Sequence, residues 1–384
     1  MSQPHSSAKP DLQLHPAMPA GEAVRHILQN LLEAMEANEE GTCAARDPEF
    51  LHDFRVAVRR TRSALSQIKG VLPAPILERF RPEFAWLGEI TGPTRDLDVF
   101  LLRYEDYRES LPEEFRDALE PLGRFLKAHQ RTEQSRLAEE LASPRYRQLK
   151  KEWADFLAAP GTQASPPHAE LPVAEVAGKR IRKILRRAIR QGEAIGEDSR
   201  PEDLHELRKT CKKLRYLLEF FQSLYPQQKV VRLIKSLKTF QDNLGEFQDL
   251  QVQSAALQKF ADQMAAEGEI PPRSLLAMGM LIEGLQHRQR QARSEFADRF
   301  AEFSREKNLR LFEELFSGSE SSSKEKQMGS CLKGKSENKP KEGAYQCDKC
   351  GAVSKKKGHL CQPEKLSGKD VKKVEKKTRK SKGK

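Results

Sequence analysis

The sequence predicts an all-α protein whose body holds two helical bundles and is followed by a small, zinc-knuckle-like tail. Charged residues make up 32% of the chain and aromatic residues 7%, a balance that suits helices better than sheets. Apolar residues of the body recur at helical spacing, without an alternation of strands and helices. A basic segment also returns at a constant offset of 153 residues, which indicates two copies of one structural unit.

The first half of the body is predicted as one bundle over residues 20–158, preceded by a disordered, proline-containing leader at 1–19. Asp47-Pro48-Glu49 is typical of a helix start, because proline is tolerated in the first turn. Gly92-Pro93 separates two further helices, and Thr94 can cap the second of them. The helices expected in this half cover residues 24–35, 48–70, 75–90, 94 onward, 113–141 and 145–158.

The second half repeats this plan over residues 172–317, after a proline-rich linker at 159–171. Pro201 and Pro226 each mark the start of a helix, and Gly245 is expected to mark a turn into the next one. The remaining helices are expected at 173–191 and from about residue 272 into the 300s. Because the two halves share their apolar pattern, we expect two bundles of similar construction.

The tail changes composition to Ser, Gly, Lys and Glu, and it contains Cys347-x2-Cys350 and His359-x-Cys361. Four such ligands suffice for a tetrahedral structural Zn²⁺ and leave no open position for catalysis by the metal. We therefore expect a flexible linker at 318–343, a zinc knuckle at 344–366 and a Lys-rich, disordered end at 367–384. The alternative is a set of reduced thiols in a flexible tail.

The net charge of +12 lies entirely in the tail, because residues 320–384 hold 20 Lys and Arg against 8 Asp and Glu. Of the 68 basic and 56 acidic residues in the chain, 48 of each remain for residues 1–319. An anion-binding site in the body must therefore come from charge gathered on particular faces. No apolar run is long enough to span a membrane and no signal peptide is present, so we expect a cytoplasmic protein without a membrane partner.

The repeated segment is a helix with an apolar stripe and an adjoining stripe of cations. At 100° per residue, His52, Arg55, Arg59 and Arg62 fall in one band beside the apolar positions. The second copy has the same geometry, and Lys209 and Lys213 widen its charged face. The candidate ligands on these two helices are His52, Arg55, Arg59, Arg60, Arg62, His205, Arg208, Lys209, Lys212, Lys213 and Arg215.

These stripes contain almost no acidic residues, so they lack the i,i+4 partners of an ordinary solvated face, and their like charges repel. Two copies of such a pattern favour an external anion over a merely solvated surface. Guanidinium and ammonium groups match phosphate oxygens well. Cations on neighbouring helices are expected to complete a basic groove: Arg79, Lys179, Arg182, Lys183, Arg186, Arg232, Lys235 and Lys238. Asp96 and Asp249 are expected to orient basic side chains or to cap helices.

The duplicated Leu-His-x-x-Arg helix, followed by Gly-x-x-(Arg/Gln)-Asp-Leu-x-Val at Gly92 and Gly245, resembles the conserved-histidine α-helical domain (CHAD) family over residues 20–316. The resemblance implies two pseudo-symmetric antiparallel helical bundles around a basic groove that binds inorganic polyphosphate, often at granules. Thr91-Gly92-Pro93 departs from the usual Leu-Gly of the family. The acidic strand motif of the triphosphate-processing domain often fused to this family is absent, so we expect a binding protein and not an enzyme.

Two other function classes stay open at this stage. His205-Glu206-Leu207-Arg208 is similar to the phosphoacceptor box of histidine kinases, which would make the chain a histidine phosphotransfer protein. The proline that typically follows that box is missing, as is a Gly-rich ATP-binding segment. The Lys-rich tail suits nucleic acid, but the body offers few aromatic platforms for base stacking near its cations.

Overall fold

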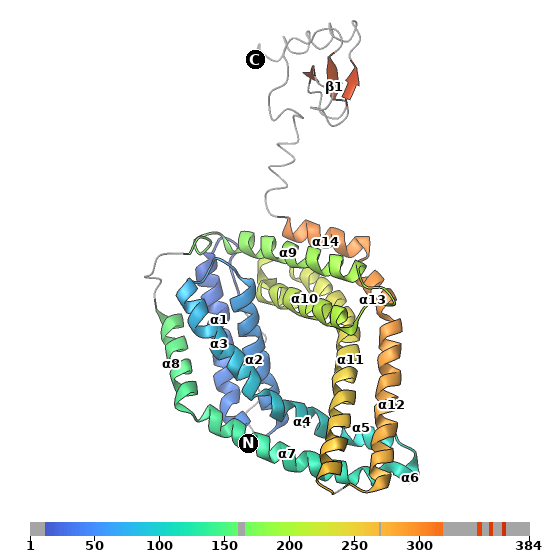
Figure 1. Cartoon of the computed structure of the whole chain (residues 1–384). Helices are drawn as coiled ribbons and strands as arrows, with labels where there is room; N and C mark the ends of the chain where they lie inside the picture. The colour runs from blue at the N-terminus through green and yellow to red at the C-terminus, as the bar shows by residue number, and fades with distance from the viewer. Residues whose placement is uncertain are drawn as a thin grey trace. The chain divides into compact units, whose positions relative to one another are not determined.

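The computed structural model describes residues 12–159, 166–268, 270–317, 344–347, 353–355 and 363–365, and the chain divides into two units, 1–316 and 317–384. Unit 1 is helical, as predicted (Figure 1). Its first half holds α1 (Ala20–Cys43), α2 (Pro48–Gln67), α3 (Ala74–Ile90), α4 (Gly92–Leu102), α5 (Tyr104–Glu109), α6 (Glu113–Arg116), the 3-10 turn η1 (Asp117–Leu119), α7 (Glu120–Leu141) and α8 (Pro144–Ala158).

The second half of unit 1 begins after the proline-rich linker. It holds α9 (Val173–Glu193), α10 (Pro201–Phe220), the 3-10 turn η2 (Gln222–Leu224), α11 (Gln227–Ala266), α12 (Pro272–Ser294), α13 (Phe296–Phe303) and α14 (Glu306–Phe316). Local sequence explains the start of α2, where the Asp47 side chain accepts a hydrogen bond from the Glu49 backbone N–H at 2.8 Å and Pro48 occupies the first turn.

The turn predicted at Gly245 is wrong, because α11 runs unbroken through this position. At the corresponding place of the first half, α3 ends at Ile90 and α4 begins at Gly92. The difference follows from the next residue. Pro93 lacks a backbone N–H and cannot continue the hydrogen-bond ladder, whereas Glu246 can.

Two apolar clusters hold unit 1 together, and each draws on both halves of the chain. The larger cluster joins α1, α2, α3 and α8 to α9, α10 and the first part of α11. The smaller one joins α4 and the first part of α7 to α12 and the second part of α11. In Figure 1 these helices surround a central opening between the ribbons. The apolar cores therefore cut across the two predicted bundles.

The leader and the linker pack more closely than predicted. Leu14 is 6% exposed, and its backbone N–H donates to Ser223 Oγ at 3.1 Å. The backbone N–H of His168 donates to the Gly70 carbonyl at 2.8 Å. Leu14 belongs to the larger core, and Ala169 of the linker is 6% exposed, so residues 12–19 and 166–171 belong to the fold of unit 1.

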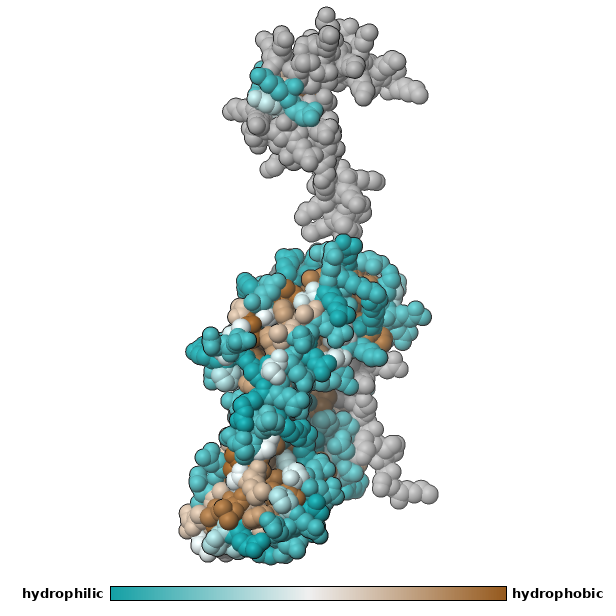
Figure 2. Space-filling model, turned by 90° about the vertical axis from the view of Figure 1, so that its right-hand side faces the viewer, coloured by the Kyte–Doolittle hydropathy of each residue, from teal (hydrophilic) through white to brown (hydrophobic). Residues whose placement is uncertain are grey.

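The face of unit 1 seen in Figure 2 is mostly hydrophilic, and apolar side chains gather near one end. Exposed apolar residues of α12 include Leu275, Leu276 and Met280. Among the described residues, no helix combines the length and apolar character needed to cross a bilayer.

The described part of unit 2 is a small antiparallel sheet, which the sequence did not predict. Its strands are β1 (Tyr345–Cys347), β2 (Val353–Ser354) and β3 (Pro363–Lys365), in the order β2-β1-β3. The predicted linker 318–343 and the Lys-rich end 367–384 lie outside the described residues.

Candidate anion-binding site

The two predicted cationic helices, α2 and α10, pack against each other across the two halves of the chain. Arg60 Nη2 of α2 donates to Glu219 Oε2 of α10 at 2.6 Å, and both side chains are largely buried. The Arg60 guanidinium also lies over the Tyr216 ring, 5.7 Å from its centroid. This contact fixes the two helices side by side. Arg60 is thus a structural cation under the site and does not line the pocket described below.

Residues 153 positions apart make matching contacts beside these helices. Arg95 Nη2 donates to His52 Nδ1 at 3.0 Å, and His205 Nδ1 donates to Gln248 Oε1 at 2.8 Å. Burial, followed by the nearby Arg95 charge, lowers the pKa of His52. Both histidines therefore have a local partner that orients the imidazole ring.

The arginine one turn after each histidine lies against a glycine of the same register. Added Cβ atoms at Gly92 and Gly245 would lie 3.9 Å from Arg55 Nη1 and 3.7 Å from Arg208 Nη2, respectively. Arg55 Nη1 donates to Thr91 Oγ1 at 2.7 Å, and Arg208 Nη2 pairs with Asp249 Oδ1 at 3.0 Å. Asp249 thus orients a basic side chain, as predicted.

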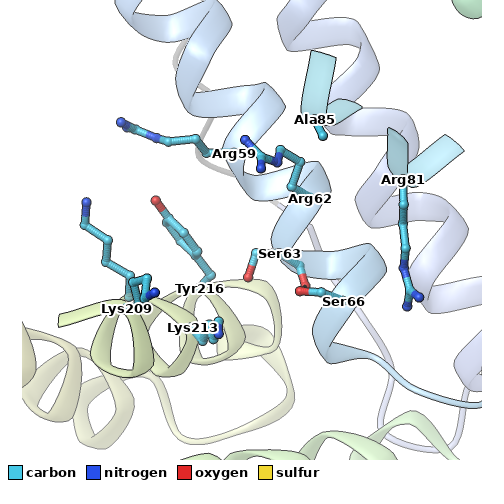
Figure 3. Close-up of a pocket in the computed structure, with 10 residues that line it drawn as sticks. Arg59, Arg62, Ser63, Ser66, Arg81, Ala85, Lys209, Lys213 and Tyr216 are labelled. Atoms are coloured by element: carbon cyan, nitrogen blue, oxygen red, sulfur yellow. The ribbon is translucent and has the colours of Figure 1, made fainter. Parts of the chain in front are cut away.

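Beyond these contacts, α2, α3 and α10 enclose an open pocket of about 390 Å³ (Figure 3). In Figure 3, Arg59 and Arg62 from α2 and Lys209 from α10 extend from their helices on either side of Tyr216. Six cations and no carboxylate line this pocket, whose residues are Arg59, Arg62, Ser63, Ser66, Arg81, Ala85, Lys209, Lys212, Lys213 and Tyr216. The volume lies within the range of roughly 300–1,000 Å³ usual for ligand sites.

Burial, and after it the charge of neighbouring cations, disfavours the positive form of several side chains in and beside this pocket. Burial, then the charges of Arg208 and Arg59, lower the pKa of Lys212 to about 8. Burial and the charge of Arg187 lower the pKa of Lys213. Burial and the charge of Arg59 lower the pKa of Arg55 to about 10. Each lowered pKa means that the positive form is disfavoured here, so an added anion would relieve the repulsion.

Lys212 also lines a second, mixed pocket. It contains His52, Arg208 and Arg215, and also three carboxylates, from Asp242, Glu246 and Asp249. Salt bridges such as that between Arg288 Nη2 and Glu246 Oε1, at 2.9 Å, neutralise part of its positive charge. The first pocket is therefore the better anion site, although Lys209 also contacts a carboxylate there, that of Glu206.

Several predicted ligands lie elsewhere. Arg79 pairs with Glu83 and with Glu152 of α8, on the opposite side of α3 from the site. Arg182 Nη1 donates to the Phe316 carbonyl. Arg232 lines a separate pocket between α11 and α14, and neither described pocket beside α10 includes the exposed Lys179, Lys183, Arg186, Lys235 or Lys238. The predicted cations therefore do not gather in a single groove.

Some lining residues could not be found from the repeat. Arg81 lies in the cationic pocket, yet the position 153 residues later is Ile234. Arg103 and Arg288 line the mixed pocket without belonging to either motif. They are brought there because α3 and α4 pack against α2 while α12 packs against α11, and no sequence signal marks these contacts.

The predicted zinc ligands are not tested by the structure. Cys350, His359 and Cys361 lie outside the described residues, and only the backbone of Cys347 is described, at the end of β1. Among the residues described, no group of three or more His, Cys, Asp and Glu gathers as a metal site would.

A scan against known protein families identifies one family. The CHAD domain matches residues 26–258. An uncharacterised Mycobacterium tuberculosis protein, Rv2226, is 29% identical over 171 residues, which cover 43% of this chain and 33% of the relative. The match thus spans about a third of that relative's length, and a protein from a second strain matches equally well.

Two solved structures have a similar fold. The CHAD domain from the plant Ricinus communis has a TM-score of 0.65 and 25% identity, covering 79% of this chain and 98% of that domain. PptA from Streptomyces chartreusis has a TM-score of 0.55 and 19% identity, covering 74% of this chain and 99% of PptA.

Proposed function

Because the chain belongs to the CHAD family, we propose that it binds inorganic polyphosphate in the cationic pocket between α2, α3 and α10. One observation carries the proposal: six cations converge there without a carboxylate among the lining residues. The family resemblance suggests polyphosphate as the ligand, and the cations of the pocket would bind its phosphate groups. Charge-assisted hydrogen bonds to phosphate oxygens contribute about 1.5–3 kcal/mol each.

The protein acts in this proposal by binding alone. The two halves are copies of one unit that bring one cationic helix each to the same pocket. Residence in the cytoplasm, at polyphosphate granules, and zinc in the tail belong to the same proposal. The proposal assigns no catalytic role to the two motif histidines, because each of them is hydrogen-bonded to a neighbouring side chain.

The lining of the pocket favours polyphosphate over nucleic acid as its ligand. Tyr216 is the one aromatic residue lining it, and this side chain is only 6% exposed. Stacking of bases needs an accessible ring face. A bare chain of phosphates needs only the cations.

The test is a titration of the full chain with polyphosphate, monitored by calorimetry. Changing Arg59, Arg62, Lys209 and Lys213 to Gln should weaken binding at least 100-fold, because four charge-assisted contacts are lost. A matched control changes Lys127, Arg131, Arg147 and Lys151 to Gln, which are exposed cations of α7 and α8. Equal affinity of the two variants for polyphosphate would refute the assignment of binding to the cationic pocket. Stronger competition by single-stranded DNA of equal charge would refute polyphosphate as the preferred ligand.

A further inference from the structure

The outward face of α9 carries a straight row of cations that belongs to neither pocket beside α10. Lys179, Lys183, Arg186 and Arg190 are all exposed. Their spacing of four, three and four residues places them within about 60° on the helix. At 1.5 Å per residue the row is roughly 16 Å long. We call these four residues the α9 row.

The opposite face of α9 fixes this row in place. Ala177, Ile181 and Ala188 are fully buried in the larger core, and Ile184 is 4% exposed. Arg182 of the same helix donates to the Phe316 carbonyl at the end of α14. The backbone that carries the row is therefore anchored along its length.

Nothing in the described part of the chain neutralises the α9 row. Within residues 12–159, 166–268 and 270–317, none of the four side chains forms an ion pair or a hydrogen bond. The acidic residues of α9 are Glu175 and Glu193, near its two ends. Like charges at i,i+4 destabilise a helix by a few tenths of a kcal/mol per pair. The row is unfavourable until an anion lies along it.

Two further arginines connect the α9 row to the cationic pocket. Arg180 Nη2 donates to Gln67 Oε1 of α2 at 2.7 Å, which joins α9 to the helix that forms one wall of the pocket. Arg187 lies near enough to Lys213, a lining residue, for its charge to lower the pKa of that lysine. Positive charge thus continues from the pocket onto α9.

We infer that the α9 row is a second contact surface for polyphosphate, engaged only by chains long enough to extend from the cationic pocket onto α9. The row would make the protein prefer long chains, and this inference rests on the proposed function. A linear chain of phosphates matches a straight row of cations. The row itself has no aromatic or apolar member, so it offers neither base stacking nor insertion into a lipid surface.

The experiment uses the full chain with two probes, tripolyphosphate and long-chain polyphosphate. Changing all four residues of the α9 row to Gln should weaken long-chain binding about 10-fold or more and leave tripolyphosphate binding within about twofold. The slope of log affinity against log salt for the long chain should fall by about 3, at ~0.7 per phosphate contact as in single-stranded nucleic acids. The same control as above, at Lys127, Arg131, Arg147 and Lys151, removes equal charge from α7 and α8.

The outcomes distinguish this inference from the proposed function. Equal loss of long-chain affinity in the α9 and control variants overturns the inference, because only net charge would matter. Equal loss for both probes in the α9 variant also overturns it, because the row would then belong to the pocket. Failure of the unmodified chain to bind either probe overturns the proposed function itself. A double variant, Lys183→Gln with Arg186→Gln, repeats the test if the fourfold variant loses helicity.

Discussion

Lys212 links the two pockets beside α10, and its replacement by Met should stabilise the protein while weakening polyphosphate binding. Met keeps an unbranched apolar side chain of similar length and removes the charge. In the unliganded protein that charge is disfavoured, because burial and the neighbouring Arg208 and Arg59 lower the pKa of Lys212 from its ordinary 10.5 to about 8. A buried charge of this kind lowers the stability of the unliganded protein and raises its affinity for an anion.

The magnitude follows from this pKa. A lowering from 10.5 to about 8 corresponds to roughly 3 kcal/mol at neutral pH, as an upper bound. The folded state binds the proton more weakly than the unfolded state, so the penalty is fully present below about pH 8. It shrinks as the pH rises from about 8 to 10.5, where the lysine is neutral in both states. Lys212→Met should therefore raise the free energy of unfolding by about 1–3 kcal/mol at pH 7 and by less at pH 10.

Urea unfolding at pH 7 and pH 10, followed by circular dichroism, measures the stability term. Calorimetric titration with polyphosphate at pH 7 measures binding, which should weaken about 10- to 100-fold for one lost charge-assisted contact. For the unmodified chain, affinity should fall as the pH rises through about 8, since Lys212 loses its proton. A destabilised variant with unchanged affinity would refute the reasoning on both counts.

Two other predictions test the scaffold and the tail. Glu219→Gln removes the carboxylate that pairs with the buried Arg60, and it should lower the free energy of unfolding by about 3 kcal/mol in urea while leaving the salt dependence of binding unchanged. A changed salt slope would place Arg60 in the site after all. Deleting residues 318–384 removes all of the net positive charge of +12. It should lower affinity for polyphosphate modestly in a filter-binding assay but keep the preference for long chains, and loss of that preference would move the selectivity into the tail.

Helices and the motif faces could be predicted from sequence because both depend on local periodicity. Apolar spacing gave the helices of the body, and the offset of 153 residues related His52 to His205 and Arg55 to Arg208, whose local contacts correspond. Periodicity does not show where a helix breaks when the break depends on a single neighbouring residue. The turn predicted at Gly245 is absent because Glu246, and not a proline, follows it.

Tertiary packing determines which cations reach the pocket, and the sequence alone did not predict this. Arg60 has the same charge as Arg59 and is its neighbour, yet it points to Glu219 and the other does not. Arg81 enters the pocket from α3, which no repeat marks. Arg79, on the same helix, turns to α8 instead. Contacts between helices far apart in the chain select which cations converge, and a single sequence does not encode those contacts locally.

The most direct test of the central claim is a chemical footprint of the full chain with and without polyphosphate. Lysine acylation and arginine modification are quantified residue by residue by mass spectrometry. We predict that bound polyphosphate protects Arg59 and Arg62 on α2 together with Lys209 and Lys213 on α10, while Lys127 stays reactive. Binding that leaves the α2 and α10 side chains as reactive as before would contradict the account.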